Sequence, residues 1–330
     1  RFRPAFFCSN QHPRTVTPMS NILAIDWDER EARFVVAATR GENARVKAAL
    51  TVPFVELSEE EADSPENAGK KSKSREKAAP AGPDPRLGAQ LREILRKHRS
   101  GRGPVLVGVN RGNVELVHLT LPPAGDAELA ELVHNQIVRE LHVGPDDGVV
   151  DFLPMTADPD KPRAVTAALL PKAQVDRLRR TCSAAGIVPR RFLLRAYAAA
   201  SLFSRTASPP EDVCLLTNRI GDEVDLTVLA RGEVVFSRTI RLPVDLDESV
   251  LIERLTAEVK RTVAVSLQDT ADAGPVEGVY LFGGPNEYQN LIDAIQEELG
   301  MAAMVIDPFV AVDNAGQVPP QNAGEFAPLL

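Results

Sequence analysis

The residues best placed to do chemistry lie in a short turn near the start of the chain. An apolar stretch, residues 21–25, runs into Asp26, Trp27 and Asp28, and a second apolar stretch, residues 31–40, leaves the turn. A tight turn between two strands often offers backbone N–H groups to a phosphate, and glycine or hydroxyl residues suit that task. Acids at Asp26 and Asp28 predict instead that the two side chains are caps, turn formers or a weak cation site.

Other catalytic arrangements are missing from the sequence. Five histidines (His12, His98, His118, His134, His142) are too dispersed for a metal cluster, and the three cysteines (Cys8, Cys182, Cys214) form no CxxC pair. No P-loop, G-x-S-x-G or H-E-x-x-H motif occurs. We therefore expect no metal site, no activated nucleophile, and free thiols in a reducing cytoplasm.

Length and charge restrict the classes of protein. The 330 residues, 44% of them hydrophobic, suffice for two domains with sizeable cores. A formal charge of -8, from 38 basic and 46 acidic residues, excludes attraction of the whole surface to nucleic acid or anionic lipid, so only a local basic patch could serve such a partner. No apolar run approaches the ~20 residues that span a bilayer.

Hydrophobic periodicity predicts three successive units. Strands at 21–28, 31–40 and 44–57, a helix at 86–99 and a strand at 104–110 make the first. A strand at 114–122, a helix at 126–141, strands at 148–155 and 163–171, a helix at 172–187 and a strand at 188–196 make the second. A short helix at 197–203, strands at 211–219, 223–230 and 233–242, a helix at 249–267, a strand at 278–284, a helix at 288–299 and a strand at 302–308 make the third.

The first and third units share an order. Each opens with a three-strand meander and continues with a helix and a returning strand, which is the order of a ribonuclease-H-like half. The fold class we predict is α/β, an actin-like fold built from two such halves, with a small inserted α+β subdomain. We expect residues 1–19 to be a disordered leader or misassigned start, 20–112 the first actin-like subdomain, 113–195 the insert, and 196–330 the second actin-like subdomain. The charged stretch 58–85 lacks apolar anchors and predicts a flexible, solvated loop, whose basic part could alternatively touch an anionic surface.

Several motifs, in this order, resemble those of the type IV pilus assembly protein PilM family and the related cytoplasmic part of type II secretion protein GspL. They are "LTLPP" leading into the helix at 126–141, "VVDF", "SAAGIVPRRF", "DLTVLARGEVVFSRTIRLP", "LFGG" and "IDPF". Both families belong to the actin-like ATPase superfamily, which includes FtsA. The resemblance covers residues 20–330.

The resemblance also implies where a nucleotide would bind, and the sequence departs from that pattern. The family's first turn carries Asp-x-Gly, whereas this chain keeps Asp26 but has Asp28 in place of the glycine. In the second turn Asn218 replaces the acid and Gly221 lies one position late. Gly283 and Gly284 remain in the third turn, and Lys260 and Arg261 lie on the helix that flanks the adenine in relatives. Because carboxylates repel phosphate, we expect no ATPase activity and no cofactor. The alternative left open is a magnesium-dependent ATP-binding ATPase or kinase-like enzyme.

The family's partners lead to a second expectation. In PilM proteins a groove between the first subdomain and the insert binds the N-terminal peptide of a bitopic inner-membrane protein. The resemblance therefore implies a non-catalytic scaffold at the cytoplasmic side of the inner membrane, with a PilN-like or GspM-like partner, a secretion ATPase as a further candidate, self-association through the insert, and no nucleic acid. Candidate contacts are Trp27, Val107, Val109, Leu129, Val133 and Ile137. Relatives continue beyond "DPF" into an apolar helix, so we expect that C-terminal helix to be missing here, or a continuation with a membrane span as in GspL.

Overall fold

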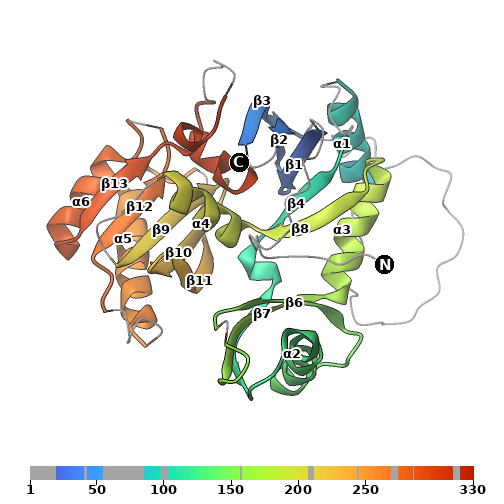
Figure 1. Cartoon of the computed structure of the whole chain (residues 1–330). Helices are drawn as coiled ribbons and strands as arrows, with labels where there is room; N and C mark the ends of the chain where they lie inside the picture. The colour runs from blue at the N-terminus through green and yellow to red at the C-terminus, as the bar shows by residue number, and fades with distance from the viewer. Residues whose placement is uncertain are drawn as a thin grey trace, which may run out of the picture.

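The computed structural model describes residues 20–40, 43–54, 85–97, 103–156, 158–206, 212–243, 245–268, 274–284, 286–314 and 320–330. The leader expected at 1–19 and the loop expected at 58–85, apart from Pro85, lie outside the described residues. Within these ranges the chain forms two lobes side by side, with a smaller sheet attached to the first lobe (Figure 1).

The first lobe is a five-stranded sheet in the order β3-β2-β1-β4-β8. Its strands are β1 (Ser20–Trp27), β2 (Glu31–Arg40), β3 (Asn43–Pro53), β4 (Val105–Val109) and β8 (Pro189–Leu194). The first three form the antiparallel meander, and β4 and β8 add in parallel. Helices α1 (Pro85–Lys97) and α3 (Lys172–Ala184) pack against each other and bury Leu91, Leu95, Val175 and Cys182.

The second lobe repeats this arrangement with the order β11-β10-β9-β12-β13. Its strands are β9 (Val213–Ile220), β10 (Glu223–Ala230), β11 (Glu233–Arg241), β12 (Gly278–Phe282) and β13 (Ala302–Ile306), and its helices are α5 (Glu248–Ser266) and α6 (Gln289–Leu299). The matching strand orders confirm the two actin-like halves that the repeated meander predicted.

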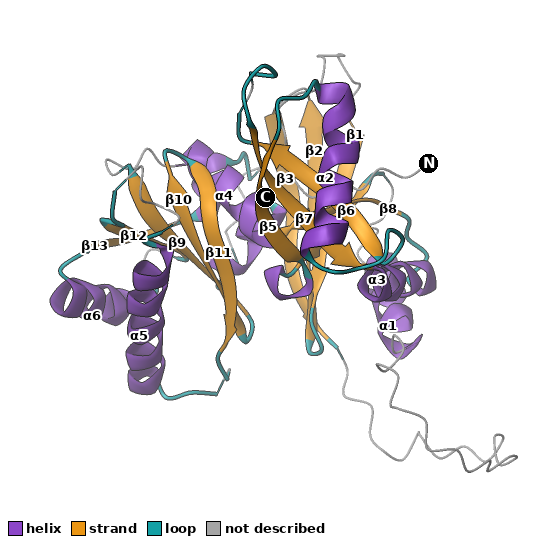
Figure 2. Ribbon diagram, turned by 90° about the horizontal axis from the view of Figure 1, so that it is seen from below, coloured by secondary structure: helices purple, strands orange, loops and turns teal. Residues whose placement is uncertain are grey.

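The insert is smaller than predicted. It contains only β5 (Glu115–Leu121), α2 (Asp126–Glu140), β6 (Gly148–Pro154) and β7 (Arg163–Pro171), with the sheet order β5-β7-β6 (Figure 2). The helix and strand that we assigned to the end of the insert, α3 and β8, belong instead to the first lobe. The reason is that Phe192 and Leu194 are buried in that lobe's core while β8 pairs with the edge of β4.

Two segments join the lobes. Helix α4 (Arg195–Thr206) begins directly after β8, and its Phe203 packs on Tyr280 of the second lobe with ring centroids 5.0 Å apart. The 3-10 segment η5 (Ala323–Leu329) contacts α4, β2 and β9, and its Phe326 is fully buried. We expected the C-terminal helix that follows "DPF" in relatives to be missing. Residues 323–329 form η5, which is part of the core between the lobes.

Candidate functional site

An open cleft of about 1210 Å³ lies between the two lobes. Its walls come from the β1–β2 turn, the end of β4, the start of α4, the β9–β10 turn and η5, and it extends toward α1 and α3. The turns of both meanders meet here because the two halves face each other. Asp26, Asp28 and Gly221, far apart in the sequence, are thereby brought to one place.

Asp28 closes the first turn with its own carboxylate. Its Oδ1 accepts hydrogen bonds from the backbone N–H groups of Arg30 (2.7 Å) and Glu31 (2.9 Å), and its Oδ2 accepts one from the Arg33 guanidinium (2.6 Å). Burial disfavours the charged form, yet Arg33 and the two backbone donors together hold the pKa of Asp28 below its ordinary value. The turn amides that a phosphate would need are already bound to an anion of the chain.

Arg33 on β2 is fully buried and does not itself line the cleft, but its carboxylate partners do. Besides Asp28, it pairs with Glu31 at 2.6 Å, Glu325 of η5 at 3.0 Å and Asp26 at 3.9 Å. Burial opposes its charge, but the surrounding carboxylates raise the pKa of Arg33, so it stays ionised. Burial, together with Glu325 and Asp28, raises the pKa of Glu31 despite its pairing with Arg33.

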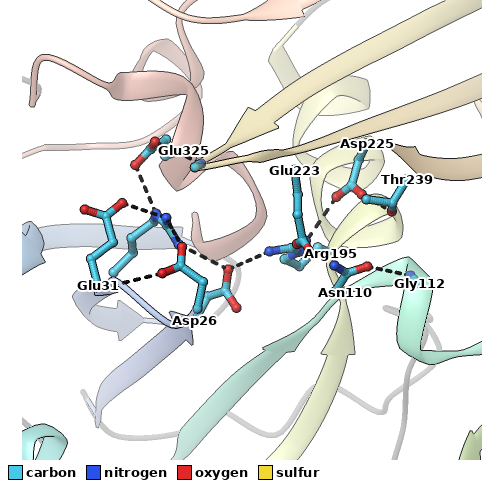
Figure 3. Close-up of polar contacts among 12 residues, drawn as sticks. Asp26, Glu31, Asn110, Gly112, Arg195, Glu223, Asp225, Thr239 and Glu325 are labelled. Carbon is cyan, nitrogen blue, oxygen red and sulfur yellow. Dashed lines mark hydrogen bonds and ion pairs between the residues drawn. The ribbon is translucent and has the colours of Figure 1, made fainter. Parts of the chain in front are cut away.

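Arg195, the first residue of α4, is a second buried cation. Figure 3 shows its guanidinium between Asp26 on one side and Glu223 and Asp225 on the other. It contacts Asp26 at 3.0 Å and Asp225 at 3.7 Å and donates a short hydrogen bond to Glu223. Burial raises the pKa of Asp225, although Arg195 and the Thr239 hydroxyl favour its charged form. The two arginines therefore form one buried ion-pair network that joins both lobes.

The other two turns are also closed by carboxylates. In the β9–β10 turn Gly221 has φ +60°, and its N–H donates to Glu325 Oε1 at 3.2 Å. In the turn after β12 the Gly284 N–H donates to Glu287 Oε2 at 2.8 Å. A Cβ on Gly283 would lie 2.9 Å from the Tyr288 ring, so this glycine is required by packing within the turn.

The remaining candidate nucleotide residues lie away from the cleft. Asn218 is 2% exposed, and its side-chain amide has no hydrogen-bond partner among the described residues. Lys260 and Arg261 lie on the exposed face of α5 and are not among the residues that line the cleft. The arrangement does not fit a nucleotide phosphate, because internal carboxylates already accept hydrogen bonds from four turn amides, those of Arg30, Glu31, Gly221 and Gly284. The charges of the two buried guanidinium groups are likewise taken up by carboxylates of the chain.

Sequence reasoning missed the residues that hold this network together: Arg33, Arg195 and Glu325. The sequence pattern could have indicated Arg33, because an arginine within the apolar run of residues 31–38 requires a buried anionic partner. The identity of that partner, 292 positions away in the case of Glu325, was not visible in any local pattern.

One end of the cleft is apolar. Trp27, Phe54, Leu87 and Leu178 are partly buried there, from the β1–β2 turn, the end of β3, α1 and α3. The rim carries Arg30, Arg177, Gln90 and Gln174, of which both arginines are exposed. We call these eight residues the Trp27 niche. Partly exposed aromatic and aliphatic side chains beside arginine are typical of a protein-binding site.

The predicted partner contacts divide into two groups. Trp27 lies in the niche and Val109 lines the cleft, although Val109 is only 2% exposed. Val107 is fully buried in the first lobe, while Leu129, Val133 and Ile137 fill the core between α2 and the insert sheet. These last four residues were wrong candidates, because their helical or strand spacing reflects core packing and leaves them no surface for a partner.

The parts of the chain that the structure describes contain neither a metal-binding cluster nor a membrane-spanning helix. Within them no group of histidine, cysteine, aspartate or glutamate residues is arranged to hold a metal ion. None of the helices described is both long enough and apolar enough to cross a membrane.

Comparison with known proteins identifies a solved structure with the same fold. No protein-family model matches the chain, and no curated protein matches it. A chain of the PilM-PilN type IV pilus biogenesis complex superposes with a TM-score of 0.71 at 19% identity, covering 94% of this chain and 97% of that one.

Two further structures are more distant. A Bacteroides thetaiotaomicron protein with an actin-like ATPase fold gives a TM-score of 0.47 at 10% identity, covering 88% of this chain and 91% of that one. The cytoplasmic domain of EpsL, an inner membrane component of the Vibrio cholerae type II secretion system, gives 0.46 at 13% identity, covering 79% and 82%. The chain thus has the actin-like fold expected from its sequence, in the form seen in the PilM-PilN complex.

Proposed function

We propose that this chain is a non-catalytic adaptor in a type IV pilus assembly or type II secretion platform at the cytoplasmic side of the inner membrane. Its partner would be the N-terminal peptide of a PilN-like or GspM-like bitopic membrane protein. The fold shared with a chain of the PilM-PilN complex supports the choice of system.

The observation that carries the proposal is the set of three internal caps. Asp28, Glu325 and Glu287 bind the backbone N–H groups of the β1–β2, β9–β10 and β12–α6 turns. A nucleotide phosphate would have to displace these carboxylates and, at Asp28 and Glu325, also break their pairing with Arg33. Because removing one partner of a buried ion pair costs ~3–5 kcal/mol, such displacement would consume much of the free energy that nucleotide binding supplies.

The Trp27 niche is the surface we assign to the peptide. An extended peptide with apolar side chains would fill the space beside Trp27, Phe54 and Leu178, while Arg30 and Arg177 would attract an acidic residue next to them. Neither arginine side chain has a hydrogen-bond or ion-pair partner among the residues described, so both are available to a ligand.

Two titrations test the proposal. Since Trp27 is the only tryptophan of the chain, its fluorescence reports directly on the niche when the partner's N-terminal peptide is added. We expect a saturable blue shift for the wild type and its loss in Leu178→Glu, whereas Met304→Glu, at a 52% exposed position on the second lobe, should bind normally. Calorimetry with ATP and magnesium should show no binding. Tight nucleotide binding would favour the ATPase alternative, and an unchanged peptide affinity in Leu178→Glu would place the peptide elsewhere.

A further inference from the structure

A group of basic side chains gathers on the outer side of the first lobe. Helices α1 and α3 and strand β8 lie on the side of the first lobe that faces away from the second lobe (Figure 1). We call six of their exposed bases the basic face: Arg92, Arg96, Lys97, Arg179, Arg180 and Arg190.

Helix α1 is in close contact with α3 and with the loop that joins α3 to β8. A Cβ on Gly88 of α1 would lie 2.3 Å from the Ala184 Cβ of α3, so glycine lets the two helices meet there. A Cβ on Gly186 would lie 3.6 Å from Arg92 Nε, which places the α1 arginine over the loop that joins α3 to β8. That loop carries Val188, which is 81% exposed and lies two residues before Arg190 in the chain.

The charge of the segments that carry the basic face is opposite to that of the chain. The residues of α1 include four bases and a single acid, Glu93, and residues 172–194 include six bases and a single acid, Asp176. Both acids are paired within their own helices, Glu93 with Arg96 at 2.7 Å and Asp176 with Lys172 at 3.3 Å. A chain of net charge -8 thus concentrates a net excess of eight positive charges in these segments.

We propose that the basic face binds the anionic surface of a phospholipid bilayer. Each exposed lysine or arginine near such a surface contributes an attraction that acts over about a Debye length and needs no shape complementarity. Figure 2 shows α1 and α3 next to each other at one edge of the first lobe. The exposed side chain of Val188 can enter the headgroup region. This binding is separate from the Trp27 niche and does not depend on the proposed peptide partner.

Vesicle flotation of the full chain tests the proposal. The protein should float with vesicles of phosphatidylglycerol mixed with phosphatidylcholine at low salt, should not float with phosphatidylcholine alone, and should be released at high salt. Arg180→Glu/Arg190→Glu should reduce the bound fraction at least tenfold. The matched control is Arg254→Glu/Lys260→Glu, which reverses two exposed bases on α5 of the second lobe and should float like the wild type.

The outcomes separate the alternatives. Absence of flotation in the wild type, equal flotation with neutral vesicles, or equal loss in both double variants would overturn the proposal. If the wild type ignores vesicles but binds a soluble polyglutamate peptide through Arg180 and Arg190, the surface recognises an acidic protein segment and the lipid assignment is refuted. The Trp27 fluorescence titration uses soluble peptide alone, so failure of lipid binding and failure of the adaptor proposal are read out independently.

Discussion

Replacing Arg195 by methionine is the sharpest test of the buried network. The side chain is 3% exposed and lies against Asp26, Glu223 and Asp225, which are themselves 5%, 8% and 2% exposed. Methionine keeps most of the volume but leaves three buried carboxylates with no central cation. Removing one partner of a buried pair costs ~3–5 kcal/mol, so we expect a loss of this size in the free energy of unfolding measured by urea denaturation.

The magnitude should depend on pH in a defined direction. Burial already raises the pKa of Asp225, and without the opposing Arg195 charge this pKa will rise further in the folded state. The folded protein then binds more protons than the unfolded chain, so the stability of the variant should increase as pH falls from neutrality. The deficit relative to the wild type should therefore be largest at neutral pH and smaller in mild acid.

Two control variants make this test decisive. Arg241→Met removes a guanidinium that also pairs with Glu223, at 3.2 Å, but is 76% exposed, so we expect a cost of ~1 kcal/mol or less. Adding Glu223→Gln and Asp225→Asn to Arg195→Met should restore much of the lost stability, because it removes the uncompensated charge. A cost below that of Arg241→Met, or a deficit that grows in acid, would refute the electrostatic account of the cleft.

Three further predictions concern the turns and the carboxylates that cap them. Glu325→Gln should lower the free energy of unfolding by ~1–3 kcal/mol, because a charge-assisted hydrogen bond to Arg33 is weakened; Glu298→Gln, exposed on α6, should have no effect in the same urea titration. Arg33 and the turn amides hold the pKa of Asp28 below 3.8 in the folded protein. The contribution of ionised Asp28 to stability is therefore present above that pH and is lost as pH falls through the lowered folded value. Asp28→Asn should remove that part of the acid-unfolding profile. Gly221→Ala should destabilise the protein by ~1 kcal/mol, since φ is +60° and a Cβ would lie 3.0 Å from Asp28 Oδ2, whereas Gly125→Ala, with nothing within 4 Å, should be neutral in thermal unfolding.

Local pattern was enough to predict the strands and their order in each half. Alternation in residues 31–40 and the apolar run at 105–109 each fit one type of element, and the repeated meander led to the actin-like fold. The same patterns did not say which sheet a strand joins. Strand β8 was therefore assigned to the insert, although its Phe192 packs in the first lobe.

The site was less predictable than the fold because its chemistry depends on distant partners. Asp28 was recognised as incompatible with phosphate, but its pairing with Arg33 was not predicted. Leu129, Val133 and Ile137 show the converse problem. An apolar helical stripe fits a core and a binding groove equally well, and only the burial of these residues distinguishes the two.

The long separation between Arg33 and Glu325 has a consequence for how the molecule folds. If the first-lobe sheet forms early, the buried guanidinium of Arg33 lacks one counter-ion. That counter-ion, Glu325 of η5, lies 292 positions further along the chain. Contacts of such sequence separation are slow to form. During ribosomal synthesis the ion pairs of Arg33 therefore remain incomplete until residue 325 has emerged, and the final packing of the first lobe is coupled to that of the second.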